Sequence, residues 1–507
     1  MADQIGRRTF LEAVGAVGLS LVLPLGVAGC GRADGVDIAG GGQLPMPPLL
    51  EGELQGGVRL FRLRLQTGAV DFGAGAPTAT YGVSGAYLGP TLKLRRGERV
   101  RIEVTNALDE TTTLHWHGME VPARSDGGPY QTIAAGATWT TEFDVTQRPL
   151  TAWYHPHQMH ATARHVYMGM AGLIVVEDDP GTPALPASYG IDDLPLVIQD
   201  RRFFADGTHP YSNGQHPAMH DMMAGLKGST ILVNGAVVPR GVVPRGLTRL
   251  RVLNGSNARN YNLGFGDDRG FLQIASDGGL LAVPVAMTRL LLAPGERAEL
   301  LVDFSADPTS GVVTLRSYSG EAFAALFTGQ MGDNLADALD RGSFDVASFV
   351  IGGAPPRALS APTQLEAIAR MAESSAVRTR QLVMSMRMGS VFINAARMTE
   401  LASVPAAISY DIPAGDTELW VVSNTSGMAH PLHIHHRQFQ LLDIDGVAPP
   451  PALAGWKDTV LVGPNRVVRL LVSFAGVADR EFPYMFHCHI LEHEDDGMMG
   501  RFFIVQP

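Results

Sequence analysis

Cysteine is almost absent from this chain, since its 507 residues contain only Cys30 and Cys488. A fold held together by several disulfides is therefore excluded. Charged residues make up only 18%, and the net charge of −11 leaves no basic excess to neutralise phosphates, so we expect no nucleic-acid partner. No Ser or Cys stands in a triad-like context, which disfavours nucleophilic hydrolysis.

Long apolar runs are also scarce. The uncharged stretch from Ala13 to Gly29 is interrupted by Pro24 and falls short of the roughly 20 apolar residues that cross a bilayer. It follows Arg7-Arg8-Thr9-Phe10-Leu11, which resembles a twin-arginine export signal. It ends in Val27-Ala28-Gly29-Cys30, which resembles a bacterial lipobox.

These two motifs predict an exported protein. We expect residues 1–29 to be a signal peptide, Cys30 to be lipidated, and residues 30–44 to form a flexible tether. The mature protein would be periplasmic or at the cell surface, attached to a membrane through its lipid only. An uncleaved membrane anchor is the alternative.

Glycine and proline are abundant, with 58 and 33 residues, which favours a turn-rich all-β fold. An alternating strand between a glycine and an asparagine occurs three times, at 97–106, 246–254 and 415–424. We therefore predict three β domains at 45–180, 191–352 and 379–507. Helices are expected only in short segments, near Thr363–Glu373 and after Cys488.

Ten of the 16 histidines gather in four short clusters in the first and third repeats. The clusters are His115-Trp116-His117-Gly118, His155-Pro156-His157, His430-Pro431-Leu432-His433-Ile434-His435, and His487-Cys488-His489 followed by His493 and Met498. The middle repeat has Leu263 and Phe265 at the distances from Asn254 at which the first and third repeats have histidines after their own asparagines. The middle domain is thus expected to be a spacer without ligands.

The donor atoms in these clusters indicate copper. Residues i and i+2 of a strand share a face, so each His-x-His pair presents two imidazoles to one side, while Cys488 points the other way from His487 and His489. A thiolate with two imidazoles and a thioether is the blue-copper combination, and imidazoles without carboxylates suit copper better than Mg, Ca or Mn. Structural zinc is the alternative, but four ligands per site would leave most of these histidines unexplained.

The four clusters resemble the multicopper oxidase family, with bacterial three-domain laccases and copper efflux oxidases the most similar. The segment Gly455-Trp456-Lys457-Asp458-Thr459-Val460 and the tail from His493 to Met498 add to the resemblance. It implies three cupredoxin-like Greek-key β-sandwich domains and four copper ions, one type 1, one type 2 and two type 3. The implied ligands are His430, Cys488, His493 and axial Met498 for type 1, His115 and His433 for type 2, and His117, His155 and His489 with His157, His435 and His487 for the type 3 pair.

The implied activity is one-electron oxidation of a reductant at type 1 copper, electron transfer through Cys488, and four-electron reduction of dioxygen to water. Asp126 and Glu494 match acidic residues that the family assigns to proton delivery. A turn or an orienting contact to a histidine is the alternative role for each. The enzyme is expected to be a monomer.

The sequence leaves two classes of reductant open. Short connections near type 1 copper favour phenols and aromatic amines, as in a laccase. A Cu(I) oxidase for copper tolerance is the alternative, with Met428 placed to pass Cu(I) to His430. Two features argue against a Cu(I) oxidase. Ser426 stands at the position where copper efflux oxidases tend to carry an acidic residue, and the chain has no long methionine-rich insert.

Other soft side chains leave this question open. His216, Met219, His220, Met222 and Met223 form a second copper-binding candidate, with a loop as the alternative, whereas Met384, Met386 and Met388 are better explained by core packing. His160, His165, His209 and His436 are expected to be structural. A copper-free envelope scaffold is a remote alternative, since the clusters have no gaps, and a two-domain nitrite reductase is disfavoured by the three repeats.

Overall fold

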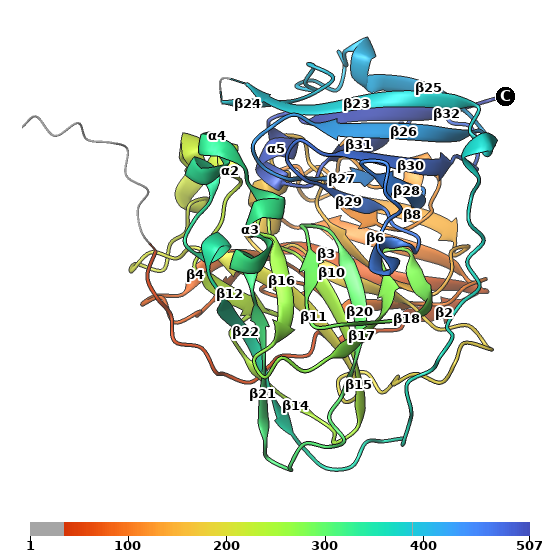
Figure 1. The fold of residues 1–507 in the computed structure, drawn as a ribbon. Helices are drawn as coiled ribbons and strands as arrows, with labels where there is room; N and C mark the ends of the chain where they lie inside the picture. Colours follow the sequence, from red (N-terminus) through yellow and green to blue (C-terminus); the bar gives the residue numbers. More distant parts are fainter. Residues whose placement is uncertain (1–34, 388) are drawn as a thin grey trace, which may run out of the picture. The chain divides into compact units, whose positions relative to one another are not determined.

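The computed structural model describes residues 35–387 and 389–507, so the export motifs, Cys30 and Met388 lie outside the described residues. Strands dominate the described chain and form six sheets, which fall into three successive pairs along the sequence (Figure 1). The all-β prediction with three sandwiches is confirmed. No helix in these two ranges is long and apolar enough to span a bilayer.

The first sandwich combines the sheets β1-β5-β10-β9-β7 and β2-β3-β6-β8, with β4 paired to β3. Its strands are β1 (Leu49–Leu50), β2 (Glu53–Gln55), β3 (Val58–Val70), β4 (Thr78–Val83), β5 (Thr91–Leu94), β6 (Arg99–Asn106), β7 (His115–His117), β8 (Thr138–Asp144), β9 (Leu150–His155) and β10 (Gly172–Val176).

The middle sandwich combines the sheets β13-β12-β11-β15-β20-β17-β18 and β14-β22-β21-β16-β19. Its strands are β11 (Asp193–Arg201), β12 (Thr230–Val233), β13 (Ala236–Val237), β14 (Arg240–Val243), β15 (Leu247–Asn254), β16 (Tyr261–Phe265), β17 (Phe271–Ser276), β18 (Gly279–Met287), β19 (Leu290–Leu292), β20 (Arg297–Asp303), β21 (Val312–Ser317) and β22 (Phe344–Ile351).

The third sandwich combines the sheets β24-β23-β26-β30-β28 and β25-β32-β31-β27-β29. Its strands are β23 (Arg378–Arg387), β24 (Ser390–Ile393), β25 (Ser409–Pro413), β26 (Thr417–Asn424), β27 (His430–Ile434), β28 (Phe439–Ile444), β29 (Thr459–Val462), β30 (Val467–Ser473), β31 (Tyr484–Cys488) and β32 (Met499–Val505).

Helices among the described residues are short. The α-helices are α1 (Thr162–Tyr167), α2 (Met219–Ala224), α3 (Ser319–Leu326), α4 (Gly329–Leu335) and α5 (Leu491–Asp495), and the 3-10 helices are η1 (Ala123–Ser125), η2 (Ser212–Gly214), η3 (Leu339–Arg341), η4 (Glu373–Ser375), η5 (Ala406–Ile408) and η6 (Pro451–Leu453). The helix expected after Cys488 is α5. The helix expected at Thr363–Glu373 is wrong, because Leu365 and Glu366 donate their amides to Ala282 and Leu281 of β18 instead of to their own segment.

The three sequence repeats occupy equivalent places in the three sandwiches. Each repeat strand, β6, β15 or β26, has one parallel neighbour and one antiparallel neighbour. The asparagine that ends each strand, Asn106, Asn254 or Asn424, donates its side-chain amide to two backbone carbonyls and accepts the amide of the residue two positions on. These bonds fix the turn that leads into β7, β16 or β27.

The cores follow the alternation of the strands. Leu263 and Phe265 of β16 are fully buried in the apolar core of the middle sandwich, where the first and third sandwiches have histidines. Methionines contribute to the core of the third sandwich, with Met384 and Met386 buried in it. Core packing therefore accounts for these two methionines, as expected.

Candidate metal centre

A thiol and two imidazoles converge inside the third sandwich. The Sγ of Cys488 lies 3.5 Å from Nδ1 of His430 and 3.7 Å from Nδ1 of His493, and all three side chains are completely buried. Adjacent strands bring two of them together, because Leu432 of β27 is in register with Cys488 of β31. The third comes from α5, which packs against β31.

The chain returns past this group directly after α5. The Cys488 amide donates to the Met498 carbonyl at 3.0 Å, and the Met498 side chain is also fully buried. Burial raises the pKa of the Cys488 thiol and lowers the pKa of His493 to about 4. Without metal, the group is therefore a neutral thiol beside neutral imidazoles, whose lone pairs are available to a soft metal ion.

The outer nitrogens of both imidazoles are held by the protein. Nε2–H of His430 donates to Ser426 Oγ at 2.8 Å, and Nε2–H of His493 donates to the backbone carbonyl of Met223 at 3.0 Å. These bonds turn both Nδ1 atoms toward Cys488. Because Met223 belongs to α2 of the middle sandwich, that helix lies against His493. Met428, two positions before His430, is buried as well.

Eight further imidazoles converge between the first and third sandwiches. On the first sandwich, β7 pairs with β9 so that His115 faces His155 across the strands. On the third, β27 pairs with β31 so that His433 faces His487. All eight are buried, and rings from the two sandwiches stack on each other, His117 on His433 at 3.6 Å and His115 on His435 at 3.9 Å between centroids.

Facing ring nitrogens divide six of these imidazoles into two groups of three. In the first group, Nδ1 of His117 lies 3.4 Å from Nε2 of His155 and 3.3 Å from Nε2 of His489. In the second, Nε2 of His487 lies 3.2 Å from Nε2 of His157 and 3.3 Å from Nε2 of His435. These are the two sets expected for the type 3 pair.

The remaining two imidazoles, His115 and His433, each have one unsatisfied nitrogen. Their Nδ1–H groups donate to the backbone carbonyls of Asp126 and Asp458, at 2.8 and 2.9 Å. Their Nε2 atoms are buried and have no hydrogen-bond partner among the described residues. Since an unpaired buried polar atom is costly, these two atoms fit metal ligands.

The electrostatics of the cluster favour metal binding over proton binding. Burial, followed by the neighbouring imidazoles, holds the pKa values of His155, His157, His435 and His487 well below 6.5. The rings are therefore neutral at physiological pH, and their lone pairs face one another. Several metal ions fit this arrangement better than one four-coordinate zinc, because the facing nitrogens outnumber the ligands of such a site.

Two carboxylates that the sequence singles out touch these imidazoles. Asp126 accepts a hydrogen bond from Nδ1–H of His435 at 2.8 Å. The two oxygens of Glu494 lie 3.1 Å from Nδ1 of His157 and 3.2 Å from Nδ1 of His487. Burial and then the nearby Asp495 raise the pKa of Glu494 well above its ordinary value, which favours the protonated form of this carboxyl.

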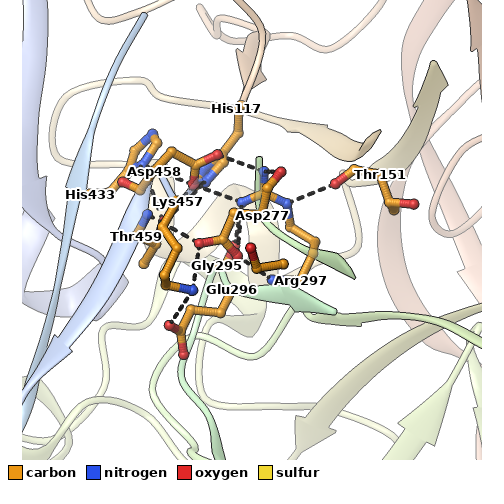
Figure 2. A network of polar contacts seen from close by, with 12 residues as sticks. His117, Thr151, Asp277, Gly295, Glu296, Arg297, His433, Lys457, Asp458 and Thr459 are labelled. Atoms are coloured by element: carbon orange, nitrogen blue, oxygen red, sulfur yellow. Dashed lines mark hydrogen bonds and ion pairs between the residues drawn. The ribbon is translucent and has the colours of Figure 1, made fainter. Parts of the chain in front are cut away.

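Two further residues at the cluster, Asp458 and Arg297, carry no role that the sequence alone predicts. Asp458 accepts a hydrogen bond from Nε2–H of His117 at 3.1 Å and pairs with Arg297 of β20 (Figure 2). Burial would raise the pKa of Asp458, but the Arg297 guanidinium outweighs it and keeps the carboxylate ionised. Asp458 stands in the Gly-Trp-Lys-Asp-Thr segment already noticed, whereas nothing in the sequence connects Arg297 with these histidines.

Four residues of the second soft-ligand candidate, Met219, His220, Met222 and Met223, lie on the helix α2. Met219 of α2 is 77% exposed, and Nε2–H of His220 donates to the Asn334 carbonyl at 2.9 Å. His216 is exposed as well. The histidines expected to be structural have protein partners: His165 bonds Thr112, His160 bonds Thr399 and Asp495, His209 bonds Ala79 and Tyr211, and His436 bonds Ala475.

Comparison with known proteins identifies relatives over nearly the whole chain. Sequence profiles of the family described as "Multicopper oxidase" match residues 64–181 and 376–507. The chain is 34% identical over 449 residues to the "Multicopper oxidase mco" of Staphylococcus aureus, covering 88% of each protein. It is 35% identical over 509 residues to the "Cell division protein FtsP" of Sodalis glossinidius, covering 99% of each.

Among solved structures, the chain is similar to a bacterial laccase-like multicopper oxidase, CueO, from the lignin-degrading Ochrobactrum sp. The two share 37% identity with a TM-score of 0.80, over 91% of this chain and 100% of the other. That protein is described as having oxidase activity towards lignin model compounds and lignosulfonate.

Proposed function

The chain belongs to the multicopper oxidase family, and on this premise we propose that it is a laccase-like oxidase of phenols and aromatic amines with dioxygen as acceptor. Four copper ions, one at the Cys488 group and three at the imidazole cluster, would supply the one-electron redox chemistry and the reduction of dioxygen to water. The main support for this proposal is that Cys488 lies between His487 and His489 in a single segment. The end of one strand therefore supplies ligands to both the Cys488 group and the imidazole cluster.

We assign the ligands as the family pattern implies. His430, Cys488, His493 and Met498 would hold type 1 copper, and His115 and His433 would hold type 2. The two groups of three facing imidazoles would hold the type 3 pair. The grouping of the ring nitrogens and the two unsatisfied Nε2 atoms support this assignment.

The backbone around Cys488 offers a short electron path. The Cys488 carbonyl accepts a hydrogen bond from Nδ1–H of His487 at 3.1 Å. Cys488 is thus connected to a cluster ligand both through the peptide bond and through this hydrogen bond. Replacement of the thiol would interrupt the path at its start.

Glu494 and Asp126 are the residues we assign to proton delivery. The carboxyl of Glu494, whose pKa is raised by burial, lies beside two cluster imidazoles, His157 of the first sandwich and His487 of the third. Asp126 accepts a hydrogen bond from the proton-bearing nitrogen of His435. Each carboxyl can therefore exchange a proton within the buried site without a movement of the backbone.

A cavity of about 620 Å³ is the site that we propose for the organic reductant. Its walls are mainly apolar and come from β19, α3 and β29, with Leu291, Ala325 and Leu461 among them. Leu461 is in register with Pro431, the neighbour of His430. A small aromatic molecule fits such a cavity, and it would lie one strand away from the type 1 ligands.

A Cu(I) oxidase is the second candidate, favoured by the position of α2. This helix contacts His493 through the Met223 carbonyl and carries Met219, His220, Met222 and Met223. Thioether and imidazole groups suit Cu(I). Met428, two positions before His430, would then take part in passing Cu(I) to the type 1 ligands.

A cell-division role without copper chemistry is the third candidate, prompted by the FtsP relatives. The complete set of buried donors supports an enzyme instead. We further propose twin-arginine export, attachment through lipidated Cys30, and a monomeric state, with Arg7-Arg8 and Cys30 as the basis in the sequence for the first two.

Metal analysis and a visible spectrum of the purified protein test the class. About four coppers per chain and an intense blue absorption are expected, and a colourless, copper-free protein after copper loading would refute an oxidase. Dioxygen consumption with a methoxyphenol, an aromatic amine and Cu(I) then compares the reductants. A preference for Cu(I) that is lost when Met219 and Met222 are replaced by leucine would favour the second candidate.

A further inference from the structure

Among the described residues, the middle sandwich carries none of the assigned ligands, yet it reaches the imidazole cluster through one fully buried arginine. Arg297, in β20, donates from Nη1 and Nη2 to the two oxygens of Asp458, at 2.7 and 2.6 Å. Both side chains are buried, Arg297 completely. Such a two-pronged pair fixes the plane of the carboxylate as well as its position.

The guanidinium is itself held from several sides. Its Nε donates to the carbonyl of Thr151 in the first sandwich, and Nη1 and Nη2 donate to the carbonyls of Gly295 and Asp277 in the middle one. Asp458 belongs to the third sandwich. Figure 2 shows this network, in which one side chain ties segments of all three sandwiches together beside His117 and His433.

His117 is oriented differently from the other cluster imidazoles. His115, His155, His433, His435 and His487 each use Nδ1–H for a protein acceptor, which leaves Nε2 toward the cluster. His117 has the opposite orientation, because its Nε2–H donates to Asp458 and its Nδ1 faces His155 and His489. The position of Asp458 therefore selects which nitrogen of His117 is offered to a metal.

The backbone next to His117 leaves room for the ion pair of Arg297 and Asp458. Gly118 has a φ of +89°, and a Cβ atom there would collide with Nη2 of Arg297 and come within 2.9 Å of an Asp458 oxygen. The absence of a side chain at position 118 thus lets the ion pair lie directly against the ligand strand β7.

We propose that Arg297 is a positioning residue of the trinuclear copper site, which locks Asp458 so that His117 presents Nδ1 as its ligand atom. This inference rests on the proposed function. It gives the ligand-free middle domain a part in the metal centre beyond that of a spacer. Removal of an outer partner of a metal-bound histidine commonly weakens metal binding by about 10- to 100-fold.

The test uses Arg297→Lys, which keeps the positive charge but cannot make the two-pronged contact. Its matched control is Arg251→Lys, because Arg251 makes a similar buried pair with Asp193 in the same domain. Copper-loaded proteins are dialysed against a graded chelator. The readouts are copper per chain, the blue absorption of type 1 copper and the electron paramagnetic resonance signal of type 2 copper.

We expect Arg297→Lys to lose trinuclear copper at a chelator concentration about 10- to 100-fold lower than the parent, with the blue absorption kept. The control should retain both sets of copper. Equal retention of trinuclear copper in parent and Arg297→Lys would overturn the proposal. A parent that binds no copper at all would instead refute the proposed function, so the two failures are distinguishable.

A second variant covers the case in which Arg297→Lys does not fold. Gly118→Ala leaves both members of the pair in place but pushes a methyl group against them, and Gly136→Ala is its control, since Gly136 also has a positive φ and its Cβ would meet nothing within 4 Å. The same selective loss is expected for Gly118→Ala only. A crystal structure of the copper-loaded parent needs no variant: His117 bound through Nε2, with Asp458 turned away, would overturn the proposal.

Discussion

We predict that His209, which makes a buried contact between the first and middle sandwiches, lowers the stability of the protein in acid. The residue is 3% exposed, and its ring lies against Tyr167 of α1, 5.4 Å between centroids. Nδ1 accepts the amide of Tyr211 at 3.2 Å, and Nε2–H donates to the carbonyl of Ala79 at 3.4 Å. A second proton would have to sit on Nδ1, facing the Tyr211 N–H.

The structure gives the size of the effect. Burial, only partly offset by the bond to Ala79, lowers the pKa of His209 from 6.5 to about 4. Between these two pH values His209 is protonated in the unfolded chain and neutral in the folded chain. The contribution of His209 to the free energy of unfolding is therefore complete above pH 6.5. Below that pH it falls by about 1.4 kcal/mol per pH unit, to a loss of about 3 kcal/mol near pH 4.

The assay is thermal unfolding of the copper-free protein from about pH 7.5 to about pH 4, for the parent and His209→Gln. Glutamine does not titrate, so the variant should lose about 3 kcal/mol less stability over this range, whatever its stability at neutral pH. His216→Gln, at an exposed histidine, is the control for the replacement itself and should follow the parent. An acid-induced decline as steep in His209→Gln as in the parent would refute the reasoning.

Three further predictions concern the metal centre. Cys488→Ser should abolish both the blue absorption and dioxygen turnover while trinuclear copper is kept, and retention of the blue band in the visible spectrum would contradict the assignment. Glu494→Gln keeps the shape of the side chain but removes its acidic proton, so dioxygen consumption should fall by about 100-fold or more at unchanged copper content; an unchanged rate in an oxygen electrode would exclude it from proton delivery. Gly295→Ala adds a Cβ 2.8 Å from the His489 ring at a φ of +82°, so we expect a loss of about 1–3 kcal/mol in the free energy of unfolding and weaker binding of trinuclear copper. Melting temperature and metal analysis measure the two effects, and parent-like values of both would contradict the close packing.

Much of the fold could be predicted because its signals are local. Alternation of apolar residues marks β6, β15 and β26, and the asparagine after each strand makes the same set of bonds in all three sandwiches. The candidate ligands follow the same logic, since the i and i+2 spacing of a strand already places His115 with His117 on one face. The comparisons confirm the family, while the role of each ligand stays a prediction.

The features that sequence reasoning missed depend on contacts between distant parts of the chain. Arg297 and Asp458 are 161 positions apart, and the bond between His493 and Met223 spans 270. No local pattern reports such a pair. The wrongly predicted helix at 363–373 has the same cause, because hydrogen bonds to β18 of the middle sandwich outweigh the helical preference of the segment.

The distribution of donors along the chain sets the order in which the protein can mature. The imidazole cluster takes its nitrogens from the segments around β7 and β9 in the first sandwich and from those around β27 and β31 in the third. A ribosome must therefore have passed both sandwiches before the last of the assigned donors exists. Metal bound at the proposed cluster would have to wait for that point, and a truncation from Cys488 onward would remove donors of both proposed sites together.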